Sequence, residues 1–361
     1  MSALARHLEA LTRIEGPLSV ARFMQEALGH PEHGAYAARN PIGAAGDFVT
    51  APEISQMFGE LVGVWAIALW RSMGAPKRVV LAEMGPGRGT LMKDLLRAAR
   101  IEPAFDAAIQ VHLIETSPTL AKVQREALGG AIVEIVPRFS DLPFGPLILI
   151  ANELFDCLPV RQFQKTQRGW CERLVDHDPH RGGFRFVLSP EPTPAATLIP
   201  PVVARAPVGA LAEISPASLS LAGAIGAHVA REGGGALIAD YGHAKSAPGE
   251  TLQALRRHAK VDPLEDPGEA DLTAHVDFES LGRAAREAGA AIHGPVGQGA
   301  FLRTLGIEAR AAALSKSAND AQRADIAAAL HRLTAPERMG SLFKMIAFLD
   351  PRLPAPPGFA P

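Results

Sequence analysis

The feature that most constrains the fold of this 361-residue chain is a glycine-rich stretch at residues 83–89, Glu-Met-Gly-Pro-Gly-Arg-Gly. The apolar residues 79–83 before it are typical of a short buried strand, and residues 90–100 after it have helical spacing. Glycine lets the backbone turn sharply and lets a ligand approach without a side chain in the way. Strand-to-helix turns lie at the carboxyl edge of parallel sheets, where these folds bind ligands, so the stretch predicts an α/β fold with a ligand site there.

Strand and helix patterns go on alternating along the chain. Ser117 and Pro118 predict the start of a helix, with serine as N-cap and proline at the first helical position. Residues 146–151 are nearly all apolar, so we expect a strand buried on both faces. This alternation predicts a doubly wound, mainly parallel sheet. Its seven expected strands are residues 79–83, 109–115, 132–136, 146–151, 235–240, 291–296 and 342–349.

Other segments interrupt this rhythm. Residues 1–60 are predicted to form an N-terminal helical lid region, and residues 61–361 the α/β domain. Thr50 to Glu53 is interpreted as a capping box that opens a helix running on through Trp70. Insertions are expected at about 160–212, which includes an antiparallel hairpin, and at about 244–275.

Composition narrows the class of protein. A net charge of −2 argues against nucleic acid as a partner. Two cysteines cannot make a disulfide framework, and no metal signature is present, so we predict no metal site. The apolar helical run at residues 61–70 is too short to cross a bilayer, and is buried either internally or in a homodimer interface. With no targeting segment visible, we expect a cytoplasmic protein that is not integral to a membrane.

The spacing of the glycines bears on the identity of the ligand. A dinucleotide fingerprint reads GxGxxG, whereas this turn reads GxGxG with an acid two residues before the first glycine. That spacing is typical of the first motif of class I methyltransferases, which bind S-adenosylmethionine. Glu115 ends the second strand and could bind ribose hydroxyls in a dinucleotide-binding fold as well as in a methyltransferase, so this residue does not distinguish the two classes. The candidate cofactor-binding residues are Glu83, Gly85, Gly87, Gly89, Thr90, Glu115 and Asp47.

A second polar group follows the strand at residues 146–151. Asn152, Glu153 and Asp156 come after this apolar run, at the same predicted edge of the sheet. They are candidates for contact with a substrate. Asn152 could equally cap a helix, with Glu153 favoured by the helix dipole, and the residues alone do not decide between the two. Glu53 is a further candidate, although a capping-box glutamate needs no other role.

With these residues in hand, the chain resembles the MidA-type methyltransferases over nearly its whole length. The resemblance rests on five stretches taken together: residues 46–56, 83–92, 151–160, 213–216 and 271–278. Ala51, Leu154 and Cys157 depart from the commoner residues of the family, and none of the three changes removes a charge.

The resemblance implies a class I fold, S-adenosylmethionine as methyl donor, S-adenosylhomocysteine as product, and an arginine of a protein as acceptor. In the mitochondrial relatives the acceptor is a peripheral-arm subunit of respiratory complex I, and the product is symmetric dimethylarginine. For such a reaction Glu153 and Asp156 are expected to clamp the guanidinium, with Glu53 or Asp47 assisting. Two alternatives remain: a non-catalytic complex I assembly chaperone that keeps the fold, and an NAD-dependent oxidoreductase on a Rossmann sheet.

Overall fold

The computed structural model describes residues 2–35, 49–131 and 133–359. The chain divides into two compact units. The core unit comprises Val49–Phe155, Ala222–Ala244 and Leu281–Pro361. The accessory unit comprises Met1–Phe48, Asp156–Leu221 and Lys245–Ser280. The lid function predicted for residues 1–60 stays a prediction.

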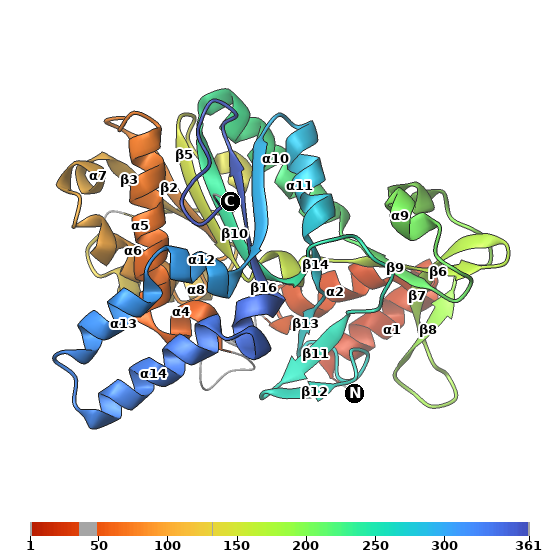
Figure 1. Cartoon of the computed structure of the whole chain (residues 1–361). Coiled ribbons are helices and arrows are strands. Elements are labelled where there is room, and N and C mark those ends of the chain that lie inside the picture. The colour runs from red at the N-terminus through yellow and green to blue at the C-terminus, as the bar shows by residue number, and fades with distance from the viewer. Residues whose placement is uncertain (1, 36–48, 132, 360–361) are drawn as a thin grey trace. The chain divides into compact units, whose positions relative to one another are not determined.

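The core unit is built on a sheet whose strands follow the order β15-β16-β10-β5-β2-β3-β4 within the described residues (Figure 1). Neighbours from β10 to β4 pair in parallel, whereas β16 is antiparallel to both β10 and β15. This arrangement confirms the predicted mainly parallel sheet. The strands are β2 (Val79–Met84), β3 (Ile109–Ile114), β4 (Val133–Val136), β5 (Leu147–Asn152), β10 (Gly234–His243), β15 (Ala291–Gly297) and β16 (Phe343–Leu349).

Helices lie on both faces of this sheet, as a doubly wound fold requires (Figure 1). On one side α5 (Gln56–Ser72) packs closely against α6 (Thr90–Ala99). Gly63 of α5 makes this close approach possible, because a Cβ at this position would come within 2.8 Å of the Ala98 Cβ. On the other side lie α10 (Pro216–Glu232) and α11 (Phe278–Glu287). The core unit also contains the helices α4 (Ala51–Ile54), α7 (Pro103–Ala108), α8 (Pro118–Leu128), α12 (Gln298–Thr304), α13 (Ile307–Ser315) and α14 (Asp320–Thr334).

The local signals for strands and for α8 are confirmed. Every residue of β2 and of β5 is buried, as expected for strands covered on both faces. The Ser117 side chain accepts a hydrogen bond from the N–H of Leu120 and so caps α8. None of the helices among the described residues is long and apolar enough to span a membrane.

The helix predicted from Thr50 through Trp70 is wrong in one respect, because the chain breaks it at Ser55. This residue is extended, with φ −163° and ψ 140°, so α4 ends before it and α5 begins after it. Ser55 caps α5 by accepting from the N–H of Met57. The predicted capping box does not form, since the side chain of Thr50 caps nothing and Glu53 bonds elsewhere. Tertiary contacts have overridden the local signal here.

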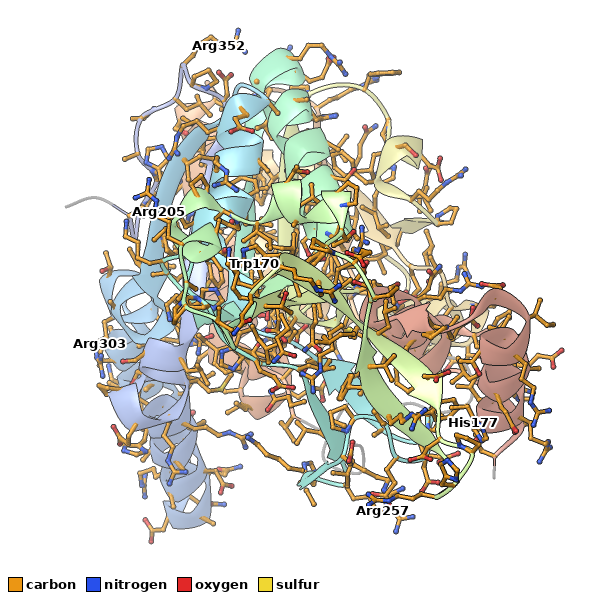
Figure 2. The ribbon with its side chains drawn as sticks, turned by 90° about the vertical axis from the view of Figure 1, so that its right-hand side faces the viewer. Trp170, His177, Arg205, Arg257, Arg303 and Arg352 are labelled. Carbon is orange, nitrogen blue, oxygen red and sulfur yellow. The ribbon has the colours of Figure 1, made fainter. Side chains whose placement is uncertain are left out.

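The accessory unit contains more structure than the antiparallel hairpin predicted within residues 160–212. One sheet has the order β1-β7-β6-β9, with β8 paired to β7, and a smaller one has the order β12-β11-β13. Trp170 of β7 donates from its indole nitrogen to the carbonyl of Ala204 (3.3 Å), at the end of α9 (Figure 2). The elements are α1 (Ala3–Glu15), β1 (Leu18–Ser19), α2 (Val20–Gly29), β6 (Arg161–Thr166), β7 (Gly169–His177), β8 (Phe184–Leu188), α9 (Pro201–Ala204), β9 (Leu211–Ile214), β11 (Gln253–Arg256), β12 (Ala259–Val261), β13 (Asp271–Thr273) and β14 (Val276–Asp277).

Candidate active site

The glycine turn between β2 and α6 has a left-handed backbone at each predicted glycine. The φ angles are +64° at Gly85, +52° at Gly87 and +81° at Gly89. Side-chain-bearing residues rarely adopt this region, so the turn requires glycine. At Gly85 a Cβ would also come within 2.8 Å of the Leu154 Cδ1, which places the glycine turn directly beside the segment that follows β5.

Glu83 lies buried beneath this turn, at the end of β2. The residue is 3 % exposed, and burial raises the pKa of its carboxyl from the ordinary 4.5 to about 8. The N–H of Met92 donates to the carboxyl and acts on the pKa in the opposite direction. Its Oε2 atom has no hydrogen-bond partner among the described residues. A buried polar atom without a partner is costly, which suits a place where a bound ligand supplies one.

This burial predicts a pH dependence of stability. The folded protein holds the Glu83 proton up to about pH 8, whereas the unfolded chain releases it near 4.5. The free energy of unfolding should therefore fall as the pH rises through this window, by about 1.4 kcal/mol for each unit of raised pKa at most. Glu83→Gln removes the titrating group. The melting temperature of this variant, measured relative to that of the wild type, should therefore rise from pH 5 to pH 8. Glu126→Gln, an exposed change on α8, should show no such gain, and equal profiles for all three proteins would contradict the burial of this charge.

The carboxylate of Glu115 is held in place at the end of β3. Its Oε1 accepts from the N–H of Ser117 (2.7 Å), and its Oε2 accepts from the Gln124 Nε2 (2.9 Å). The same Nε2 donates to the carbonyl of Gly87 (2.8 Å), so Gln124 ties the predicted ribose-binding acid to the glycine turn. Gln124 is fully buried, and its Oε1 lacks a partner among the described residues. The sequence interpretation missed it, although a glutamine on the buried face of a helix was a signal.

The chain makes a strained turn directly after β5. Glu153 has φ +50°, a conformation that is uncommon for a residue with a side chain. Its Oε1 accepts from the N–H of Ala51 (2.9 Å) and from the Nδ2 of Asn152 (3.2 Å). Asn152 is the last residue of β5, and the next helical turn begins only at Phe155, so the alternative in which Asn152 caps a helix is wrong.

Short helix α4 joins these parts of the core unit. Its first residue, Ala51, donates to Glu153, while the Oε1 of Glu53 accepts from the hydroxyl of Thr90 at the start of α6. Predicted residues from three distant stretches of the chain therefore come together around the glycine turn. Backbone strain and convergent polar groups of this kind cluster at functional sites.

Two predicted residues lie outside this group. Asp47 falls outside the described residues. Asp156 is buried at the point where the chain enters the accessory unit, and its carbonyl accepts from the N–H of Ala274 (2.9 Å).

A network centred on Glu213 organises the accessory unit near Asp156. The Glu213 carboxylate accepts from the N–H and hydroxyl of Thr251, from the N–H of Leu252 (3.0 Å) and from the Gln162 Nε2 (2.8 Å). The Thr251 hydroxyl in turn accepts from the N–H of His275 (2.8 Å). Two of the five stretches that carry the family resemblance, 213–216 and 271–278, are thus joined through a single threonine.

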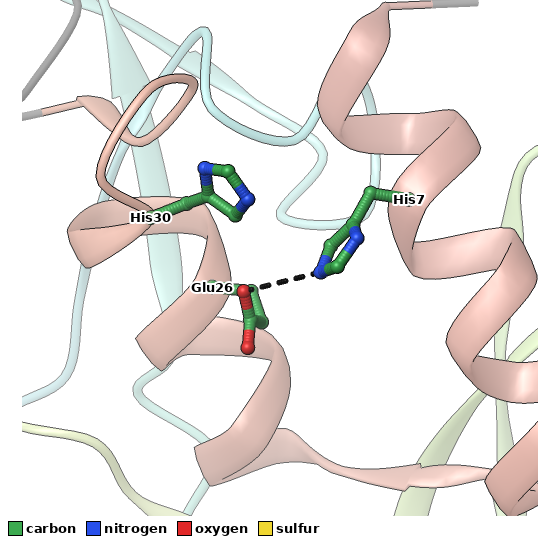
Figure 3. Close-up of side chains that lie close together, drawn as sticks. All are labelled: His7, Glu26 and His30. Carbon is green, nitrogen blue, oxygen red and sulfur yellow. Dashed lines mark ion pairs between the residues drawn. The ribbon is translucent and has the colours of Figure 1, made fainter.

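A third cluster, in the accessory unit, brings together His7 of α1 with Glu26 and His30 from α2 and its end (Figure 3). The His7 Nε2 lies 3.5 Å from the Glu26 Oε2. However, the Nδ1 of His30 accepts from the N–H groups of Glu32 and His33, both at 3.2 Å. A neutral imidazole that accepts at Nδ1 carries its proton on Nε2, which removes the lone pair a metal ion would need. The geometry therefore favours an ion-paired cluster over a metal centre.

The residues around the glycine turn fit S-adenosylmethionine. The turn offers three left-handed glycines. Within the part of the chain that the structure describes, the buried acceptor atoms Glu83 Oε2 and Gln124 Oε1 have no donor, and an ammonium, a hydroxyl or an amine of the cofactor could supply one. Glu115 stands at the end of the neighbouring strand, where such folds hold a ribose. Fold and site together define a class I S-adenosylmethionine-dependent methyltransferase.

Known proteins agree with this class. Residues 61–296 match a family described as "Putative S-adenosyl-L-methionine-dependent methyltransferase". The mitochondrial protein arginine methyltransferase NDUFAF7 of Danio rerio is 38 % identical over 96 % of this chain and 87 % of its own length, and that of Homo sapiens is 36 % identical over 97 % and 84 %. The structure of a Burkholderia thailandensis protein bound to S-adenosylhomocysteine is 31 % identical, covers 99 % of this chain and 94 % of its own, and has a TM-score of 0.85. The chain belongs to this MidA-like family of methyltransferases, and its cofactor is S-adenosylmethionine.

Proposed function

We propose that this methyltransferase transfers the methyl group to an arginine of a protein. Relatives that match almost the whole chain are named protein arginine methyltransferases. The chemistry of the acceptor explains why carboxylates are needed: a guanidinium stays protonated at any ordinary pH, and a carboxylate can hold its planar fork and favour one nitrogen as the nucleophile. The observation that carries the proposal is the Glu153 carboxylate, fixed by a strained backbone directly beside the glycine turn.

Each residue of the site has a proposed task. When bound, S-adenosylmethionine supplies an electrophilic methyl group on its sulfonium. Gly85, Gly87 and Gly89 would admit the cofactor, Glu83 would bind its amino-acid part, and Glu115 would hold its ribose. Glu153 would orient the acceptor guanidinium and stabilise the extra positive charge on it until one of its N–H protons is released to solvent. Asn152 positions this carboxylate, and Glu53 holds Thr90 at the start of α6.

Asp156 is proposed as the second acid of the clamp. Two carboxylates could pair with two edges of the planar guanidinium and so favour one of its nitrogens as the nucleophile. Asp47, which lies outside the described residues, is proposed to assist. For the acceptor we propose a subunit of respiratory complex I, as the family resemblance implies. We propose that the two proteins meet in the cytoplasm.

Mass spectrometry tests this function. The purified protein is incubated with S-adenosylmethionine carrying a deuterated methyl group and with fractionated cell protein, and the products are fragmented. We expect label on arginine side chains of one or a few proteins, and no label when excess S-adenosylhomocysteine is present. Label on lysine or on a small molecule would contradict the proposal. Binding of the cofactor without any transfer would favour the assembly-chaperone alternative instead.

A further inference from the structure

The backbone after β5 departs from the conformation that the sheet would impose on it. If β5 continued as a strand, residues 153–155 would be extended and would pair with β10, which runs parallel beside it and aligns Ala239 with Asn152. Instead Glu153 adopts φ +50°, and the chain leaves the sheet. A residue with a side chain stays in this region only where its surroundings hold it there.

Two hydrogen-bond acceptors on β10 hold this turn. The N–H of Glu153 donates to the carbonyl of Ala239 (2.8 Å), and the N–H of Phe155 donates to the Oδ2 of Asp240 (2.9 Å). A side-chain carboxylate therefore takes the place of the main-chain acceptor that a continuing strand would use. The other oxygen, Oδ1, accepts from the N–H of Tyr241 (2.9 Å), which orients the carboxylate toward the turn. Asp240 is fully buried, so water cannot replace either bond.

We infer that Asp240 is a positioning residue for methyl transfer, which holds the turn at residues 153–155 so that the Glu153 carboxylate points at the acceptor. This inference rests on the proposed function of Glu153. Were the turn to relax to an extended backbone, the side chain at position 153 would leave the N–H of Ala51 and the neighbourhood of the glycine turn. Misplacement of a catalytic group by about 1 Å can cost about 100-fold in rate.

The test is Asp240→Asn, which keeps the volume of the side chain. The asparagine amide has one oxygen, which can accept from only one of the two N–H donors, those of Phe155 and Tyr241. Its NH₂ group then faces the other N–H, so that hydrogen bond is lost. We expect kcat to fall by about 10- to 100-fold while the affinity for S-adenosylhomocysteine stays within about twofold of wild type. In a Glu153→Gln background the same change should cause no further loss, because the group that it positions is already disabled.

Asp350→Asn is the matched control. Asp350 is also buried in this sheet, but it follows β16 at the opposite end of β10, where it accepts from the exposed Arg352 (2.7 Å) (Figure 2). We expect this variant to melt at a lower temperature with kcat unchanged. A fall in kcat that follows melting temperature in both variants would show Asp240 to be merely structural.

The outcomes separate the inference from the proposed function. If Asp240→Asn has a normal kcat while Glu153→Gln is slow, the inference is wrong and the function stands. If both variants have a normal kcat, the clamp function itself is wrong. Additive losses in the double variant would show that Asp240 acts independently of Glu153, which also overturns the inference. Should Asp240→Asn fail to fold, Asp240→Ser, whose hydroxyl oxygen can still accept one N–H, serves in the same cycle.

Discussion

The Gly87→Val variant should lose its affinity for S-adenosylhomocysteine by about 100-fold or more while it remains folded. Gly87 has φ +52° at the centre of the turn, and its carbonyl is already held by Gln124 (2.8 Å), so the backbone cannot turn away to make room. A β-branched side chain there would stand in the space that the glycines leave for the cofactor and would strain the backbone as well. Isothermal titration with S-adenosylhomocysteine measures the affinity, and circular dichroism checks the fold.

Gly130→Val separates the two causes. Gly130 also has a left-handed backbone, with φ +96°, and a Cβ on it would meet nothing within 4 Å. This control should therefore lose stability through backbone strain but bind the cofactor normally. If Gly87→Val binds within a few-fold of wild type, the turn does not form the cofactor site, and the assignment of Gly85 and Gly89 to that site is refuted with it.

The Glu153→Gln variant should lower kcat by about 100-fold or more with cofactor affinity unchanged. Glutamine keeps the length of the side chain, and its amide oxygen can still accept from the N–H of Ala51, so the turn should keep its shape. What disappears is the negative charge that would orient the guanidinium and stabilise the extra positive charge on it. Single-turnover transfer to an unmethylated peptide that contains the acceptor arginine measures the rate of the chemical step.

Glu115→Gln provides the opposite phenotype as a control. This change lies at the ribose position, so it should weaken cofactor binding by about tenfold and leave kcat nearly normal once the cofactor is saturating. A Glu153→Gln enzyme that turns over at the wild-type rate would eliminate Glu153 as the clamp. Loss of cofactor affinity in that variant would instead move Glu153 into the cofactor site.

Much of the fold of the core unit could be predicted because its signals are local. Apolar runs such as residues 146–151 specify buried strands, and Ser117 with Pro118 specifies the start of α8. The predicted helix through Ser55 was wrong, because the local pattern of Thr50 and Glu53 competes with partners elsewhere: Glu53 is held by the hydroxyl of Thr90. The antiparallel hairpin within residues 160–212 was predicted, but the pairings of β7 with β1 and of β6 with β9 were missed, because they join residues far apart in the sequence.

The candidate site shows the same division. Acids at strand ends could be identified from their order in the chain, because parallel strands end at one edge of the sheet. Gln124 and Asp240 could not be assigned their roles in this way. Each acts through a hydrogen bond to a residue far away in sequence, 37 positions for Gln124 to Gly87 and 85 positions for Phe155 to Asp240.

The sequence by itself determined where this protein turns and what it can bury: three glycines that accept a left-handed backbone, and apolar strands that must be covered on both faces. These are properties of a few neighbouring residues and do not depend on the rest of the chain. Only the tertiary structure decided which carboxylates meet, and it did so by placing β10 beside β5. The conformation of Glu153 is unfavourable in isolation, and it persists because the sheet brings acceptors from β10 to the N–H groups of the turn.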